Sequence, residues 1–198
     1  MIAPFVLTLI TPPAPDLARL RDALAALPPG AAAVQLRQPD GATRRALAQP
    51  IAALCRDHGA ALLVNDDLPL AAAIGADGAQ LPERGPSVVA AREALGEAAW
   101  IGVSRHDAAG LRAARDATVA LLSPVFTVPG NGAPLGVDGF ARAARGAPLP
   151  VHALGGVTAA SAPALRDVGA SGAAVIRAVF DAKDAAAAAA ALAAPFLA

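Results

Sequence analysis

Short apolar runs alternate with longer helical patterns along the whole chain, and this alternation restricts the fold more than any other feature of the sequence. The apolar runs predict eight strands, at residues 5–10, 33–36, 61–64, 78–81, 100–103, 119–122, 151–154 and 173–176. The helical patterns predict helices at residues 16–27, 42–58, 70–74, 87–95, 108–115, 137–145 and 161–168, and an alanine-rich helix after Asp181. Regular alternation of this kind is typical of a parallel sheet covered by helices. Eight units favour a compact (β/α)₈ TIM barrel over a doubly wound open sheet, which usually has fewer units.

Chain length, charge and cysteine content narrow the class of protein. The 198 residues fit one domain, residues 1–198, without a linker. Lysine plus arginine equals aspartate plus glutamate at 16 each, so the chain lacks the basic surplus of a nucleic-acid-binding protein. Cys55 is the only cysteine, which excludes a disulfide-built scaffold and predicts a small core residue. The apolar start lacks the basic region of a signal peptide and the apolar tail is too short to span a bilayer, so we expect a soluble cytoplasmic protein.

Polar residues are scarce, yet they gather just after the predicted strands. In a (β/α)₈ barrel the chemistry lies at the carboxyl ends of the strands and in the loops that follow them. The residues placed there are Gln35, Arg37, Asn65, Asp66, Gln80, Glu83, Ser104, His106, Ser123, Gly155, Gly156, Ile176 and Arg177. We therefore predict a binding site at this rim.

The last two units predict a phosphate site. Gly155 and Gly156 follow the seventh strand, and glycine lets a phosphate approach the backbone closely. Barrels often bind phosphate between the loops after strands seven and eight, where Arg177 would add charge-assisted hydrogen bonds. The alternative is that the glycine pair only makes a tight turn.

An acidic pair follows the third strand. Asp66 beside the amide of Asn65 suits Mg²⁺, which prefers oxygen ligands and usually keeps several waters. Equally, Asp67 is placed to cap the short helix that follows, and Asp66 to pair with a basic neighbour such as Arg37. The sequence leaves both interpretations open.

Two further features concern side chains near the strand ends. Gln35 and Arg37 alternate along the second strand, so they share a face, which is either the barrel lumen or the solvated outside. His106, after the fifth strand, is a candidate general acid or base because the usual imidazole pKa lies near neutrality. His152 lies within the seventh strand and is predicted to be a hydrogen-bonded interior residue.

Seven segments taken together resemble the thiamin phosphate synthase and TenI superfamily. They are Val34-Gln35-Leu36-Arg37, Leu62-Leu63-Val64-Asn65-Asp66, Gly75-Ala76-Asp77-Gly78-Ala79-Gln80-Leu81, Ile101-Gly102-Val103-Ser104-Arg105-His106, Ser123-Pro124-Val125-Phe126, Ala153-Leu154-Gly155-Gly156-Val157 and Gly169-Ala170-Ser171-Gly172-Ala173-Ala174-Val175-Ile176. They occur in the order and spacing of the family. The resemblance implies a (β/α)₈ barrel and a transferase of thiamin biosynthesis, which joins hydroxymethylpyrimidine diphosphate to thiazole phosphate and releases pyrophosphate.

The resemblance also implies roles for individual residues. Those that would face the pyrimidine and its diphosphate are Gln35, Asn65, Ser104 and Arg37, with Asp66 as a Mg²⁺ ligand. Those that would cradle the thiazole phosphate are Gly155, Gly156, Ile176 and Arg177. In such a reaction Mg²⁺ and cations stabilise the leaving pyrophosphate, while the thiazole nitrogen traps a pyrimidine cation.

The chain departs from the family pattern in several loops. Pro39 stands where the synthases have a lysine, and Pro82-Glu83-Arg84-Gly85 stands where they have the second metal carboxylate. Val128-Pro129-Gly130-Asn131 replaces a Thr-x-Thr-Lys-like run that grips pyrophosphate. Pro124 stands where the TenI tautomerases have a histidine.

Two alternatives to the synthase therefore stay open. One is a TenI-like thiazole tautomerase, with His106 or Glu83 handling protons, and the other is a catalytically silent phosphate-binding paralogue. In each case the expected partner is a small phosphorylated molecule, and a homodimer is one assembly open to the chain.

Overall fold

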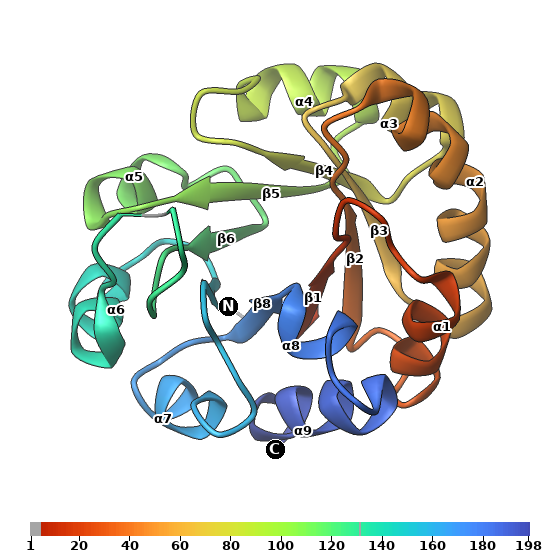
Figure 1. The fold of residues 1–198 in the computed structure, drawn as a ribbon. Coiled ribbons are helices and arrows are strands. Elements are labelled where there is room, and N and C mark those ends of the chain that lie inside the picture. Colours follow the sequence, from red (N-terminus) through yellow and green to blue (C-terminus); the bar gives the residue numbers. More distant parts are fainter. Residues whose placement is uncertain (1–4, 131) are drawn as a thin grey trace.

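Eight parallel strands, hydrogen-bonded in chain order, close into a barrel in the computed structural model, which describes residues 5–130 and 132–198 (Figure 1). The strands are β1 Leu7–Ile10, β2 Ala32–Leu36, β3 Ala61–Asn65, β4 Gly78–Leu81, β5 Trp100–Arg105, β6 Val119–Leu122, β7 Val151–Leu154 and β8 Gly172–Val175. The barrel closes where β1 pairs with β8, with Leu7 opposite Ala173. This closure confirms the predicted barrel and excludes the open sheet.

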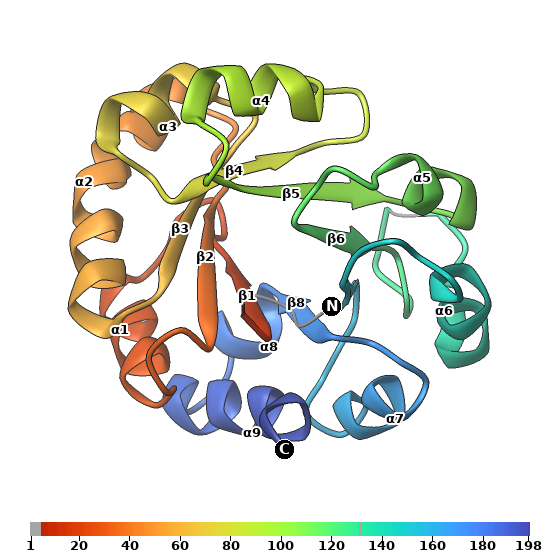
Figure 2. The same ribbon diagram turned by 180° about the vertical axis from the view of Figure 1, so that it is seen from behind.

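The helices form a ring outside the strands, as Figures 1 and 2 show from opposite sides. They are α1 Leu17–Ala25, α2 Gly41–His58, α3 Leu68–Ile74, α4 Val88–Leu95, α5 Ala108–Ala113, α6 Gly136–Ala144, α7 Ala162–Asp167, α8 Arg177–Phe180 and α9 Ala185–Leu197. The predicted alanine-rich helix after Asp181 is confirmed as α9, and it is preceded by the short helix α8, which was not predicted. Helix α9 begins at Ala185. Its N-cap residue is Asp184, whose carboxylate accepts a hydrogen bond from the backbone N–H of Ala187 at 2.9 Å. Within the described residues, the helices are too short or too polar to cross a membrane.

Alternate residues of each strand point into the barrel, where they form its inner core. Nearer the amino ends of the strands lies an apolar cluster of Phe5, Ala33, Ala61, Leu63 and Val119, with Trp100 packed against it. Nearer the carboxyl ends lies a second cluster of Ile10, Leu121 and Ala174. The polar residues Gln80 and His152 are fully buried, the latter as predicted for an interior histidine.

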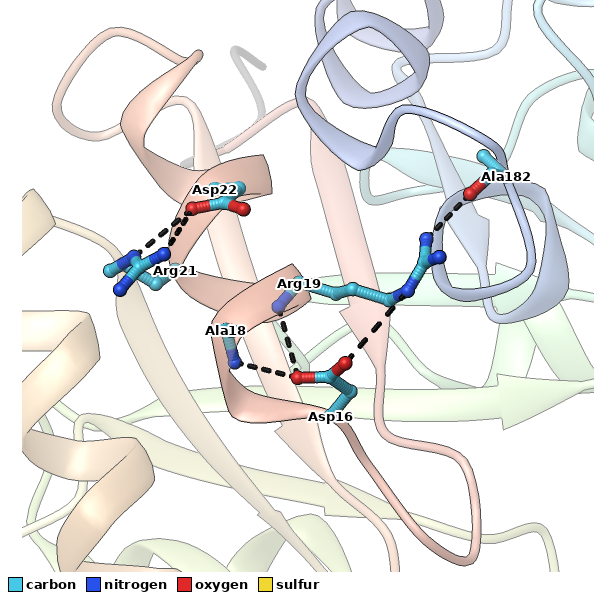
Figure 3. A network of polar contacts seen from close by, with 6 residues as sticks. All are labelled: Asp16, Ala18, Arg19, Arg21, Asp22 and Ala182. Carbon is cyan, nitrogen blue, oxygen red and sulfur yellow. Dashed lines mark hydrogen bonds and ion pairs between the residues drawn. The ribbon is translucent and has the colours of Figure 1, made fainter.

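The first and last units are joined by a polar contact as well as by the strand pairing. Asp16 caps α1 by accepting a hydrogen bond from the backbone N–H of Ala18 at 2.9 Å (Figure 3). Arg19, on the same helix, donates to the carbonyl of Ala182 in the segment between α8 and α9. Since α1 also packs against α9, the helical ring closes at the same seam as the barrel.

Candidate active site

A cavity of about 830 Å³ opens at the carboxyl ends of the strands. Its size suits a small organic ligand, and its position is the one expected for a barrel enzyme. Ten of the thirteen residues predicted at the rim line it, namely Gln35, Arg37, Asn65, Asp66, Ser104, Ser123, Gly155, Gly156, Ile176 and Arg177. The face shared by Gln35 and Arg37 is therefore the lumen side rather than the outside.

The floor of the cavity contains two hydrogen-bonded polar pairs. The Gln35 amide donates to Asn65 Oδ1 at 2.7 Å, which joins β2 to β3. Gln35 Oε1 is buried and has no partner among the described residues, so it is free to accept a hydrogen bond from a bound ligand. These neutral amides suit an uncharged heterocycle that carries N–H donors.

Ser104 is oriented by a residue beneath it. Gln80 is fully buried, and its Nε2 donates to Ser104 Oγ at 3.1 Å. With that acceptor position filled, the hydroxyl hydrogen of Ser104 is available to a ligand. The side chain of Gln80 fits only because residue 102 is glycine, since a Cβ there would overlap Gln80 Oε1.

The part played by Gln80 was missed from the sequence, which placed it at the rim but gave it no role. The signal was its position in the strand. Gln80 lies opposite Asn65 on one side and Gly102 on the other, so its side chain shares the inner face with theirs.

Two glycines form the wall that follows β7. Gly155 and Gly156 have φ angles of +98° and +67°, which favour glycine. A Cβ at Gly156 would lie 2.8 Å from the Cβ of Phe126, so this turn packs tightly against the loop after β6. The predicted tight turn is therefore present, and both of its glycines line the cavity.

Two guanidinium groups from neighbouring parts of the rim also reach the cavity. Arg37 follows β2 and Arg177 follows β8, with β1 between these strands. They are the only cations among the described residues that line the cavity. The arrangement offers two positions for anions. One is at Arg37, on the side of the cavity that also contains Asp66, and the other is at Arg177, on the side of the glycine turn.

Asp66 and Asp67 have different surroundings. Asp67 caps α3 by accepting from the Leu70 N–H at 3.1 Å, and it pairs with Arg44 at 2.9 Å. Asp66 is exposed, lines the cavity, and makes no ion pair with another described residue. The predicted pairing of Asp66 with Arg37 is therefore absent, whereas the predicted helix cap at Asp67 is present.

Asp66 is an exposed carboxylate on the wall of the cavity. The described residues contain no cluster of three or more histidine, cysteine or acidic side chains that would hold a metal unaided. Mg²⁺ is commonly held by one or two carboxylates together with substrate phosphates and waters, and a single carboxylate fits that pattern. Gly85, on the loop after β4, lies beside Asp66, with a hypothetical Cβ 3.0 Å from Asp66 Oδ1.

His106 and Glu83, like Gln80, were predicted at the rim but are not among the described residues that line the cavity. The Nδ1 atom of His106 lies 2.8 Å from Glu83 Oε2, and both side chains are exposed. The pair joins the loop after β4 to the loop after β5, outside the residues that line the cavity. Nothing in this arrangement places the imidazole at a reacting atom. In the segment Val128-Pro129-Gly130-Asn131, which differs from the family's Thr-x-Thr-Lys-like run, Val128 lines the cavity and Asn131 lies outside the described residues.

Comparisons with known proteins point in one direction. Residues 7–179 match the sequence model of the family described as thiamine monophosphate synthase. The chain is 44% identical over 184 residues to a thiamine-phosphate synthase of Thiobacillus denitrificans, covering 88% of this chain and 87% of that protein. It is 43% identical over 194 residues to a thiamine-phosphate synthase of Chromobacterium violaceum, covering 93% and 92%. A solved thiamine phosphate pyrophosphorylase from Pyrococcus furiosus superposes with a TM-score of 0.85 at 27% identity, covering 98% of this chain and 96% of that one.

Proposed function

Because the chain belongs to the thiamine monophosphate synthase family, we propose that it is a thiamin phosphate synthase that joins hydroxymethylpyrimidine diphosphate to thiazole phosphate and releases pyrophosphate. The observation that carries the proposal is the composition of the cavity. A floor of neutral amides and a hydroxyl lies beneath two separate cationic positions. Two heterocycles, one with a diphosphate and one with a single phosphate, match that pattern.

The diphosphate belongs beside Arg37 and Asp66. As the carbon–oxygen bond between the pyrimidine methylene and the diphosphate breaks, negative charge grows on the leaving pyrophosphate, and the Arg37 guanidinium stabilises it. Mg²⁺ held by Asp66 and the diphosphate oxygens would neutralise more of that charge. Asn65 and Ser104 hold the pyrimidine ring, so that the methylene carbon faces its acceptor.

The thiazole phosphate belongs beside Gly156 and Arg177. The backbone of the Gly155–Gly156 turn lines the cavity next to Arg177, whose guanidinium supplies the charge opposite to that of a phosphate. Held there, the thiazole nitrogen donates its lone pair to the methylene cation and forms the new carbon–nitrogen bond. No proton transfer is required of the protein in this bond-forming step, which agrees with a cavity that His106 does not reach.

Purified protein with both substrates and Mg²⁺ tests the proposal directly. We expect thiamin phosphate and pyrophosphate to form in equal amounts. Arg37→Gln should lower the rate sharply, whereas Arg45→Gln, which removes an exposed arginine of α2 outside the cavity, should not. Absence of thiamin phosphate at saturating substrate would refute the synthase. Binding of thiazole phosphate without any turnover would instead identify a silent phosphate-binding paralogue.

A further inference from the structure

Arg44 lies on α2 outside the cavity and contacts both loops that carry the proposed diphosphate site. Its Nη1 lies 2.9 Å from Asp67 Oδ2, in the loop after β3. Its Nη2 and Nε donate to the carbonyl of Gln38, in the loop after β2, at 2.6 and 3.1 Å. Only 16% of the Arg44 side chain and 24% of the Asp67 side chain are exposed, so solvent weakens this ion pair less than it would on an open surface.

The contact on the β2 side fixes the residue next to Arg37. The backbone of Arg37 is held on its other side by Thr11, whose hydroxyl accepts from the Arg37 N–H at 2.9 Å. Gln38 is itself buried, and its amide donates to the carbonyl of Pro12 at 2.6 Å. The backbone at residues 37 and 38 is therefore fixed, while the Arg37 side chain remains exposed towards a ligand.

The contact on the β3 side fixes the residue next to Asp66. Asp66 has a φ angle of +53° and is the only described non-glycine residue with a positive φ. Such a conformation is unfavourable for a residue with a Cβ, and it persists only where the surroundings impose it. Here they do so through the Asp66 N–H, which donates to the carbonyl of Gln80, and through the Asp67 carboxylate, which is held by α3 and Arg44.

We propose that Arg44 is a positioning residue that holds the Arg37 loop and the Asp66 loop at a fixed separation, so that both side chains face one diphosphate. The inference rests on the proposed function, because it assumes that the diphosphate lies between these two loops. Arg44 does not line the cavity, so its effect on a ligand passes through the two loops. The planar guanidinium reaches two partners at once, which a lysine ammonium on a single stem does less well.

The test compares Arg44→Gln with the wild-type protein in two measurements. Calorimetric titration with manganese pyrophosphate should show affinity weakened by about 10- to 100-fold, the range typical of residues that orient metal ligands. In turnover assays the KM for the pyrimidine diphosphate should rise in parallel, while the KM for thiazole phosphate stays within about twofold because its loops lie beyond β1. Arg44→Lys should give an intermediate loss.

A matched control and a second variant separate positioning from stability. Arg92 is a half-buried arginine on α4 that donates to the carbonyls of Glu97, Ala99 and Asp116, away from the cavity. Arg92→Gln should lower the melting temperature and leave both affinities unchanged. Asp67→Asn keeps an oxygen to cap α3 but loses the ion pair, so it should weaken pyrophosphate binding in the same direction as Arg44→Gln, and less because the contacts of Arg44 with Gln38 remain. The double variant should be little worse than Arg44→Gln alone, since Arg44→Gln already removes the ion pair with Asp67.

The results that would overturn the inference are distinct from those that would refute the synthase. If the Arg44 variants and Asp67→Asn lower stability but leave pyrophosphate affinity unchanged, or weaken both phosphate ligands equally, Arg44 is not a positioning residue. Failure of the wild-type protein to bind manganese pyrophosphate would also overturn the inference about Arg44. A wild-type protein that binds manganese pyrophosphate but makes no thiamin phosphate would refute only the proposed function, because the titration needs no turnover. If Arg44→Gln does not fold, Arg44→Lys and Asp67→Asn carry the test.

Discussion

His152 lies uncharged inside the barrel, and we expect the fold to lose stability as the pH falls through the range in which histidine is protonated in water. Burial lowers the pKa of His152 from 6.5 to about 4. The ring has few partners there, since Nδ1 lies 3.3 Å from Thr8 Oγ1 and Nε2 has no partner among the described residues. The space around it is also tight, because a Cβ at Gly172 would lie 2.6 Å from Nε2. Burial therefore disfavours an added proton, and the Phe5 backbone, which raises the pKa of His152, offsets only part of that effect.

The direction and size of the effect follow from the difference in pKa between the two states. The folded state favours the neutral ring. The contribution of His152 to the free energy of unfolding is therefore fully present above about pH 6.5 and is lost as the pH falls towards about 4. When the pH falls from about 7 to about 5, an imidazole with these two pKa values lowers the free energy of unfolding by about 2 kcal/mol. Below about pH 4 both states are protonated and this contribution no longer changes.

Urea unfolding at the two pH values measures this effect, with the fluorescence of Trp100, the single tryptophan, as the probe. His152→Gln removes the titrating group and should remove the corresponding part of the pH dependence, whatever its effect on absolute stability. The same substitution at the exposed His106 is the matched control and should leave the wild-type dependence in place. If wild type and His152→Gln lose equal stability between the two pH values, the argument from burial is wrong.

Three further predictions concern positions where the structure leaves little freedom. Gly102→Ala should displace Gln80 from Ser104, costing about 1–3 kcal/mol in thermal unfolding and raising the KM for the pyrimidine diphosphate; unchanged values would exclude the close packing. Gly156→Ala, at a φ of +67°, should raise the KM for thiazole phosphate several-fold and spare the other substrate, and equal effects on both would contradict the assigned phosphate position. Burial raises the pKa of Cys55 to about 12, so its thiol should resist iodoacetamide in the folded protein at about pH 8 and react in urea, as mass spectrometry would show.

The strands were predictable because their apolar runs are short and bounded by glycine and proline. Residues 78–81, 119–122 and 151–154 form strands at the predicted limits. The order of the strands follows from the same alternation, since right-handed crossovers place consecutive parallel strands side by side. The sequence did not predict α8, a single turn too short for its apolar spacing to be recognised.

A site residue was predictable where its side chain belongs to the end of a strand. It was unpredictable where a contact with a residue distant in the sequence sets the position of the side chain. Ser104 lies within β5 and points inward with its strand. His106 has the same parity, but β5 ends at Arg105, and Glu83 holds the imidazole outside the cavity. The role inferred for Arg44 depends on two loops that meet only in the folded protein, and a single sequence contains no signal of that contact.

The hydrogen bonds between β1 and β8 also set the order in which the chain can finish folding during its synthesis. The partner of Leu7 is Ala173, so the first strand leaves the ribosome long before its last neighbour exists. Until then β1 and β7 each present an open edge, which makes a nascent chain of this length prone to pair with other strands. The proposed diphosphate and thiazole phosphate positions lie on the two sides of this seam, so the substrate pocket cannot be complete before β8 pairs with β1.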